Sequence, residues 1–152
     1  MQVSKKRKQQ KRQVRKQPRK QMIQRFCDKH NLTPIAIGSP QFWLKNYVAC
    51  SPFQCLKIFQ NADFVITDTF HGTIFAAKYA PKYAVLIRDS NRNKLLDLIK
   101  KIKIENHLIE NMEEIDEKFS CKKDIVGFQK IIEMERRKTS IYLEQEIRRQ
   151  KD

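Results

Sequence analysis

Glycine, proline and long apolar runs are all scarce in this sequence of 152 residues. It contains three glycines and five prolines, which excludes a collagen-like chain and a glycine-rich linker. No apolar run approaches the roughly 20 residues that span a bilayer. The basic N-terminus also lacks the apolar segment that a secretory signal needs. We therefore expect a cytoplasmic protein, either free or peripheral at the inner membrane.

Cysteine is sparse as well, and its spacing does not resemble that of a metal site. The four cysteines are Cys27, Cys50, Cys55 and Cys121. Four residues separate Cys50 from Cys55, but no second pair and no nearby histidine completes a set of ligands. We interpret all four as free, mostly buried thiols in a reducing compartment. The sequence therefore predicts no metal site and no cofactor.

Basic residues are abundant but unevenly distributed along the chain. The sequence has 32 Lys and Arg against 17 Asp and Glu, a formal net charge of +15. Residues 1–25 carry 11 of the basic side chains and no acidic one, so the remainder has a net charge of only +4. The segment 4–20, SKKRKQQKRQVRKQPRK, has too few apolar residues to form a core. We predict a disordered basic arm over residues 1–21 and a folded domain over residues 22–152.

The folded part alternates between helix and strand signals. Apolar runs predict strands at 35–37, 64–66 and 83–87. Helical spacing predicts helices at 22–30, from residue 51, at 72–79, at 95–102 and, as a long C-terminal helix, at 123–149. This alternation with short connections is typical of a parallel sheet covered by helices. The sequence therefore predicts an α/β fold with a small, Rossmann-like parallel sheet.

The helices also carry signals for where they begin and which side they bury. Ser51, Pro52 and Gln54 are typical of a capped helix start. Apolar spacing identifies the side chains that should face the core. Those are Phe53, Leu56 and Phe59, then Leu95, Leu98, Ile99 and Ile102, and in the C-terminal helix Ile125, Phe128, Ile132 and Tyr142.

A short polar segment, residues 67–72 (TDTFHG), follows the 64–66 strand and opens the next helix. In open parallel sheets, ligands bind at the carboxyl ends of strands, and helix N-termini there favour phosphate or carboxylate. His71 adds a side chain that donates to an anion or moves a proton, and Gly72 allows a ligand to approach the backbone closely. Two interpretations stay open. The segment is an anion site, or it is a turn in which Asp68 and Thr69 cap a helix and His71 fills a polar corner.

A second candidate, residues 88–92 (RDSNR), follows the 83–87 strand and so belongs to the same edge of the sheet. The guanidiniums of Arg88 and Arg92 are suited to bidentate contacts with a carboxylate or phosphate. The alternative is a solvated loop whose arginines have no ligand. We interpret His30 and His107 as surface residues. The acidic residues between 110 and 117 are interpreted as a solvated face with no strand end nearby.

Residues 61–75, NADFVITDTFHGTIF, closely resemble the central motif of the polysaccharide pyruvyl transferase family, which reads roughly nAdfViTDSfHG and continues into a helix. Pro81 and the apolar strand after it match the family's step from helix to strand. Residues 92–96, RNKLL, resemble its R-x-x-L-L helix start, and residues 140–143, SIYL, resemble its Ser-x-x-Leu near the C-terminus. The resemblance covers about residues 22–147, and the segment 61–75 is its specific part.

The resemblance implies the C-terminal half of a two-domain fold similar to that of glycosyltransferase type B enzymes. Characterised family members transfer a pyruvyl group from phosphoenolpyruvate to a sugar of a cell-surface polysaccharide. His71 falls where the family places a residue at the donor, and we expect it to act as an acid or base. Arg88, Arg92 and the helix start around Asp68, Thr69 and Gly72 are the expected binding groups for the donor.

The sequence also departs from the family's pattern in two ways that bear on activity. Some family members carry Arg two positions before the motif histidine, where this chain has Thr69. The family's N-terminal domain has no counterpart in this sequence, and the expected active site lies in a cleft between two domains. We therefore expect a separately encoded N-terminal domain as a partner, a saccharide as the acceptor, and little or no transfer by this chain alone.

A non-enzymatic interpretation stays open beside the enzymatic one. Basic residues within 4–20, such as those at 5–8 and 15–16, are suited to contact phosphates of nucleic acid or of an anionic membrane surface. Residues 1–25 contain no aromatic side chain for base stacking and no known nucleic-acid motif.

Overall fold

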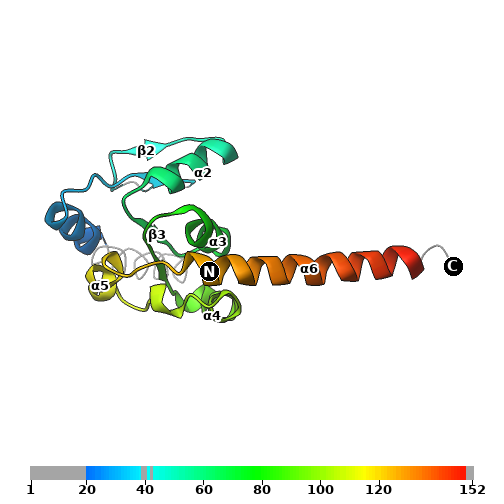
Figure 1. Cartoon of the computed structure of the whole chain (residues 1–152). Helices are drawn as coiled ribbons and strands as arrows, with labels where there is room; N and C mark the ends of the chain where they lie inside the picture. The colour runs from blue at the N-terminus through cyan, green and yellow to red at the C-terminus, as the bar shows by residue number, and fades with distance from the viewer. Residues whose placement is uncertain (1–19, 39–40, 42, 150–152) are drawn as a thin grey trace, which may run out of the picture.

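The computed structural model describes residues 20–38, 41 and 43–149 (Figure 1). The predicted basic arm therefore lies outside the described residues, except that residues 20 and 21 already belong to a helix running to residue 29. This helix buries Phe26 and Cys27, and the chain leaves it at Asn31, whose φ is +54°. The predicted helix at 22–30 is confirmed.

The described residues form a mixed α/β structure with two small parallel sheets. Its other strands and α-helices are β1 (Ala36–Ile37), β2 (Tyr47–Val48), α2 (Pro52–Asn61), β3 (Val65–Thr67), α3 (Phe70–Tyr79), β4 (Tyr83–Leu86), α4 (Arg92–Ile102), β5 (Leu108–Ile109), α5 (Ile115–Phe119) and α6 (Ile125–Arg149). Short 3-10 turns, η1 (Asp89–Asn91), η2 (Glu105–His107) and η3 (Met112–Glu114), lie between them.

The strands pair in parallel, as predicted, but they do so in two separate sheets and not in one. Strands β3, β4 and β5 form one sheet in that order, with both pairs parallel. The predicted 35–37 strand pairs instead with β2, in a separate two-stranded sheet. Neither β2 nor β5 was predicted, because each is only two residues long and no extended apolar run marks it.

Strand β4 supplies both sides of the core. Successive side chains of a strand point to opposite faces of the sheet. Tyr83 and Val85 therefore pack with residues of α2, α3, α4 and α6. Ala84 and Leu86 pack on the other face with the helix at 20–29, η3 and the start of α5. The result is a sheet with helices on both faces (Figure 1).

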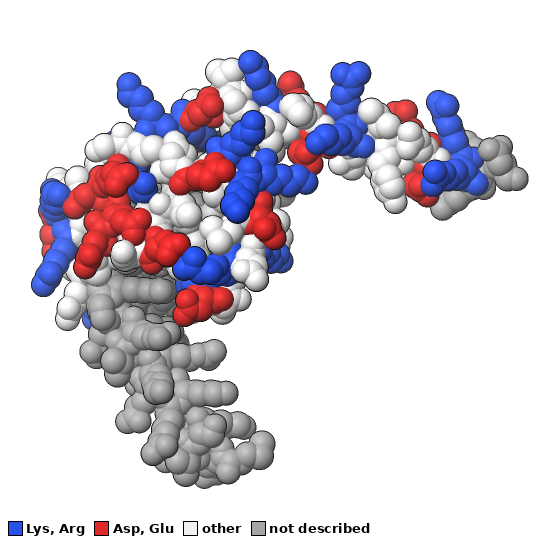
Figure 2. All heavy atoms as spheres, turned by 90° about the horizontal axis from the view of Figure 1, so that it is seen from below, with Lys and Arg blue, Asp and Glu red and all other residues white. Residues whose placement is uncertain are grey.

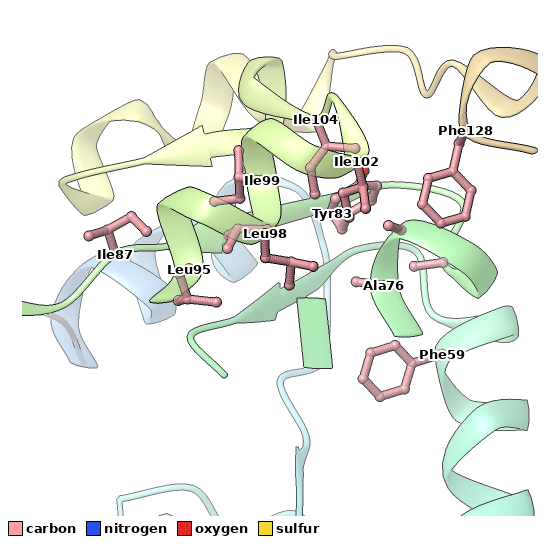
Figure 3. Close-up of a cluster of buried hydrophobic side chains, with 13 residues drawn as sticks. Phe59, Ala76, Tyr83, Ile87, Leu95, Leu98, Ile99, Ile102, Ile104 and Phe128 are labelled. Carbon is pink, nitrogen blue, oxygen red and sulfur yellow. The ribbon is translucent and has the colours of Figure 1, made fainter. Parts of the chain in front are cut away.

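The larger cluster gathers around α4 (Figure 3). The stripe predicted from sequence is fully confirmed, since Leu95, Leu98, Ile99 and Ile102 are all buried. The capped start of α2 is confirmed as well. The Ser51 hydroxyl accepts from the Gln54 amide, and the Gln54 side chain accepts from the Ser51 amide.

Three of the predicted core side chains lie outside the core. Phe53 is 81% exposed, Ile125 is 56% exposed and Tyr142 is 60% exposed. Of the predicted anchors in α6, Phe128 is buried and Ile132 is half-buried. Helix α6 contacts α4 as far as Glu135, which pairs with Lys101. Its C-terminal part, which includes Tyr142, projects away from the body (Figure 1). No helix in the part of the chain that the structure describes is both long and apolar enough to cross a bilayer.

The packing predicts that two isoleucine-to-alanine substitutions in helices lower the free energy of unfolding by different amounts. Ile99 in α4 is fully buried, whereas Ile125 in α6 is more than half exposed. We expect Ile99→Ala to lower the free energy of unfolding by about 2–5 kcal/mol and Ile125→Ala to change it by less than about 0.5 kcal/mol. Urea unfolding followed by circular dichroism measures both. Equal effects of the two substitutions would contradict the assignment of the core.

His107 is buried, so its prediction as a surface residue is wrong. It lies at the amino edge of the sheet, just before β5, and its ring stacks on Tyr83 with 4.0 Å between centroids. The Nδ1 atom is 3.1 Å from the Tyr83 carbonyl oxygen. Because a carbonyl only accepts, Nδ1 carries the proton. Burial lowers the pKa of His107, against the opposing effect of this hydrogen bond, and the charges of Lys118 and Lys123 lower it further.

The lowered pKa of His107 predicts a pH dependence of stability. The unfolded state, with a histidine pKa near about 6.5, takes up the proton first as pH falls. The contribution of the neutral imidazole is therefore complete above about pH 6.5 and is lost progressively below it. We expect the free energy of unfolding to fall between pH 7 and pH 5, and to fall less steeply in His107→Gln. The same slope in both proteins would contradict this prediction.

Candidate functional site

The two polar segments singled out in the sequence meet at the carboxyl edge of the three-stranded sheet. Because β3, β4 and β5 are parallel, their ends lie on the same side. Asp68 directly follows β3, Arg88 comes two residues after β4, and Glu110 directly follows β5. The arrangement expected for 67–72 and 88–92 is thus present, with an acidic residue added from β5.

Arg88 joins the two segments. Its Nε atom lies 3.0 Å from Asp68 Oδ2, too poorly aligned to count as a hydrogen bond, and its Nη2 donates to the Asp68 carbonyl at 3.3 Å. Asn91 Nδ2 donates to the same carbonyl at 2.6 Å, and Asn91 Oδ1 accepts from the Arg88 amide at 3.1 Å. These contacts hold the loop after β4 against the end of β3.

Thr69 caps helix α3, which therefore begins at Phe70 rather than at the predicted Gly72. Its Oγ1 accepts from the Gly72 amide at 3.1 Å, and its carbonyl accepts from the Thr73 hydroxyl at 2.8 Å. These bonds satisfy the cap, as the second interpretation of the segment expected of Thr69. They leave the amides of Phe70 and His71 without a hydrogen bond among the described residues. Asp68, which that interpretation also expected to cap the helix, has its carboxylate against Arg88 instead.

Gly72 does not serve the role that the sequence predicted. A Cβ at this position would collide with the Thr67 hydroxyl and lie 2.6 Å from Thr69 Oγ1. The missing side chain therefore makes room for two hydroxyls of the protein itself. The expectation that Gly72 opens the backbone to a ligand is corrected, because the space is already filled.

His71 is exposed in the first turn of α3, beside the edge of the sheet. Its ring contacts that of Phe70, with 5.8 Å between centroids. The Lys94 ammonium lies over the Phe70 ring, 4.8 Å from its centroid. Lys94 is a cation of this edge that the sequence reasoning missed, although its place two residues after Arg92 was a usable signal.

Arg92 is held by an acidic partner. Its Nη1 and Nη2 donate to Glu110 Oε1 and Oε2, each at 3.0 Å. These hydrogen bonds, with the opposite charges, raise the pKa of Arg92 and lower the pKa of the Glu110 carboxyl. The interpretation of residues 110–117 as a solvated face with no strand end nearby is therefore wrong for Glu110, which follows β5.

The acidic segment 110–117 also contacts His30, at a place away from the carboxyl edge. Asp116 accepts from His30 Nε2 at 2.7 Å and from Lys29 Nζ at 2.9 Å, and these bonds lower the pKa of its carboxyl. The His30 ring also packs on Phe119, with 4.3 Å between centroids. His30 thus ties the helix at 20–29 to α5, which the prediction of a surface residue did not include.

The candidate site is balanced in charge. Arg88, Arg92 and Lys94 lie near Asp68, Glu110 and Asp89, and a shallow hollow of about 370 Å³ covers residues 89–94. Figure 2 shows acidic side chains gathered on one part of the body and basic ones prominent along the projecting α6. In the described ranges, no three or more His, Cys, Asp or Glu side chains are grouped as metal ligands.

Comparisons of the chain with protein-family models, with curated proteins and with solved structures gave no match. The resemblance to the polysaccharide pyruvyl transferases therefore depends on the residues of this sequence alone.

The crowding at Gly72 predicts a specific double-mutant result. Gly72→Ala places a methyl group against the Thr67 hydroxyl, so we expect it to lower the free energy of unfolding by about 1–3 kcal/mol. Thr67→Ala removes the nearer of the two crowding hydroxyls and leaves that of Thr69. The double substitution should therefore be less destabilising than the sum of the two single ones. Urea unfolding of the four proteins gives the coupling, and simple additivity would contradict the close approach.

Proposed function

We propose that this chain forms the donor-side part of a polysaccharide pyruvyl transferase and binds phosphoenolpyruvate at the carboxyl edge of β3, β4 and β5. The observation that carries the proposal is the convergence of residues 67–72 and 88–92 on that edge, where Arg88 contacts Asp68. The sequence resemblance to the family, centred on residues 61–75, supports the same assignment.

The ion pairs of the edge are suited to exchange with the donor. Arg88 and Asp68 are both more than a third exposed, and so are Arg92 and Glu110, so solvent already weakens these pairs. A donor with a carboxylate and a phosphate offers each guanidinium a replacement partner. The free amides of Phe70 and His71 at the start of α3 add donors for one of these groups.

The transfer requires both a proton donor and a route for the leaving phosphate. The methylene carbon of phosphoenolpyruvate takes up a proton, two sugar hydroxyls form bonds to the adjacent carbon, and the bond to phosphate breaks. One hydroxyl proton ends in the new methyl group, and the other leaves with the phosphate. His71 is the group that relays a proton, while the cations stabilise the departing phosphate.

The remaining parts of the proposal follow from the family resemblance. The fold is the C-terminal half of a glycosyltransferase type B-like arrangement, and a separately encoded N-terminal domain supplies the opposite wall and the saccharide site. The chain is cytoplasmic, or peripheral at the inner membrane. Transfer by this chain alone is expected to be absent or weak.

The alternative, in which residues 4–20 bind nucleic acid or anionic lipid, involves residues outside the described ones, except for residue 20. No observation of the described residues favours it. Binding of phosphoenolpyruvate that requires residues 1–19 would favour it.

The proposal predicts opposite effects of substitutions at the two ends of one ion pair. Arg92→Ala and His71→Ala each remove a contact with the bound donor and should weaken phosphoenolpyruvate binding by about tenfold to a hundredfold. Glu110→Gln frees Arg92 from its carboxylate and should strengthen binding. Isothermal titration calorimetry of phosphoenolpyruvate with the whole chain measures all three.

Glu113→Gln is the matched control, because it removes the same charge from an exposed residue that makes no described contact with Arg92. It should leave the affinity nearly unchanged. Removing residues 1–19 should have a small effect that disappears in high salt. The proposal fails if the whole chain does not bind phosphoenolpyruvate, or if only removal of residues 1–19 abolishes binding, and the alternative then moves ahead.

A further inference from the structure

Cys50 and Cys55 lie on either side of the first turn of α2. The reciprocal bonds between Ser51 and Gln54 form a capping box. Ser51 is therefore the N-cap, Cys50 is the residue before it, and Cys55 is the fourth residue of the helix. The amide of Cys55 donates to the Ser51 carbonyl at 2.9 Å, so the turn is fully formed.

Residues at these two positions often pack against each other. In many capped helices an apolar side chain before the cap packs on the fourth helical residue and fixes the direction from which the chain enters. A free cysteine behaves as a small apolar side chain, so this pair occupies the staple positions with thiols. Burial raises the pKa of the Cys55 thiol, and the neighbouring Cys50 raises it further.

The other two cysteines differ in their surroundings. All four are free, but Cys27 is buried, whereas Cys50, Cys55 and Cys121 are half-buried. This corrects the prediction of mostly buried thiols. Cys121 accepts from Asn106 Nδ2 at 3.4 Å in a different part of the fold. Only Cys50 and Cys55 combine access to solvent with a second thiol at the staple position.

We propose that Cys50 and Cys55 are a redox modification site that closes to an intramolecular disulfide across the first turn of α2. The oxidant is a low-molecular-weight disulfide such as oxidised glutathione. Closure links the chain before the cap to the helix and so fixes the entry into α2, which packs on α3 of the candidate site.

The exchange proceeds in two balanced steps. The thiolate of Cys50 attacks one sulfur of oxidised glutathione, forming a mixed disulfide and releasing one glutathione thiolate. The Cys55 thiolate then attacks the Cys50 sulfur and releases the second glutathione. The two protein thiols lose two protons and two electrons, and the glutathione disulfide is reduced to two thiols. Cys55 is assigned to the second step because burial raises the pKa of its thiol and so lowers its thiolate fraction.

The closure is testable by mass spectrometry of the whole chain after equilibration with oxidised and reduced glutathione. Cleavage after Lys45 and Lys57 releases both cysteines in one peptide, residues 46–57. We expect that peptide to lose two hydrogen atoms and to carry no glutathione. Cys55→Ser should instead accumulate glutathione on Cys50, whereas Cys121→Ser, the control, should close normally.

A comparison with the unfolded chain shows whether the fold promotes the closure. We expect the equilibrium constant for closure to be at least about tenfold larger in native protein than in urea, because the staple positions raise the effective concentration of one thiol at the other. Equal constants in the two conditions would overturn the proposal. So would accumulation of glutathione on both cysteines of the native protein, or a disulfide that involves Cys27 or Cys121.

Discussion

Burial of β4 on both faces is the constraint from which the other features follow. Full burial of a Val or Leu side chain, such as Val85 or Leu86, contributes about 1.5–3 kcal/mol. Strand β4 directs its side chains alternately into the two clusters. The strand therefore cannot shift by one residue without exchanging its two faces. Its fixed register places Arg88 beside Asp68 at the carboxyl end and the Tyr83 carbonyl beside His107 at the amino end.

The ion pairs at the carboxyl edge position the site more than they stabilise the fold. Exposed pairs contribute little free energy, commonly less than about 1 kcal/mol. Yet the pairs of Arg88 with Asp68 and of Arg92 with Glu110 connect all three strand ends of the sheet. The guanidiniums are thereby held at the edge in a geometry suited to bidentate contacts. Under the proposed function, the carboxylates keep these cations in place until the donor replaces them.

The elements that the sequence predicted are those encoded by local signals. The start of α2 depends on Ser51, Pro52 and Gln54, which are adjacent in the chain. The buried side of α4 depends on a spacing that repeats within eleven residues. By contrast, β2 and β5 exist because a neighbouring strand pairs with them, so two apolar residues in each suffice. Phe53 and Tyr142 fit an apolar periodicity but have no neighbouring element to cover them, and both remain exposed.

The parts of the candidate site that could be predicted are likewise those encoded by local signals. The apolar run before Asp68 and the strand before Arg88 were enough to place both segments at one edge, because parallel strands end on the same side. The partner of Arg92 could not be predicted, since Glu110 is 18 residues away and reaches the edge only through the pairing of β5 with β4. The role of Gly72 was also hidden, because it depends on how Thr67 and Thr69 fold back around the helix start. A sequence shows which side chains carry charge, but whether a cation is free or paired is decided by contacts between distant segments.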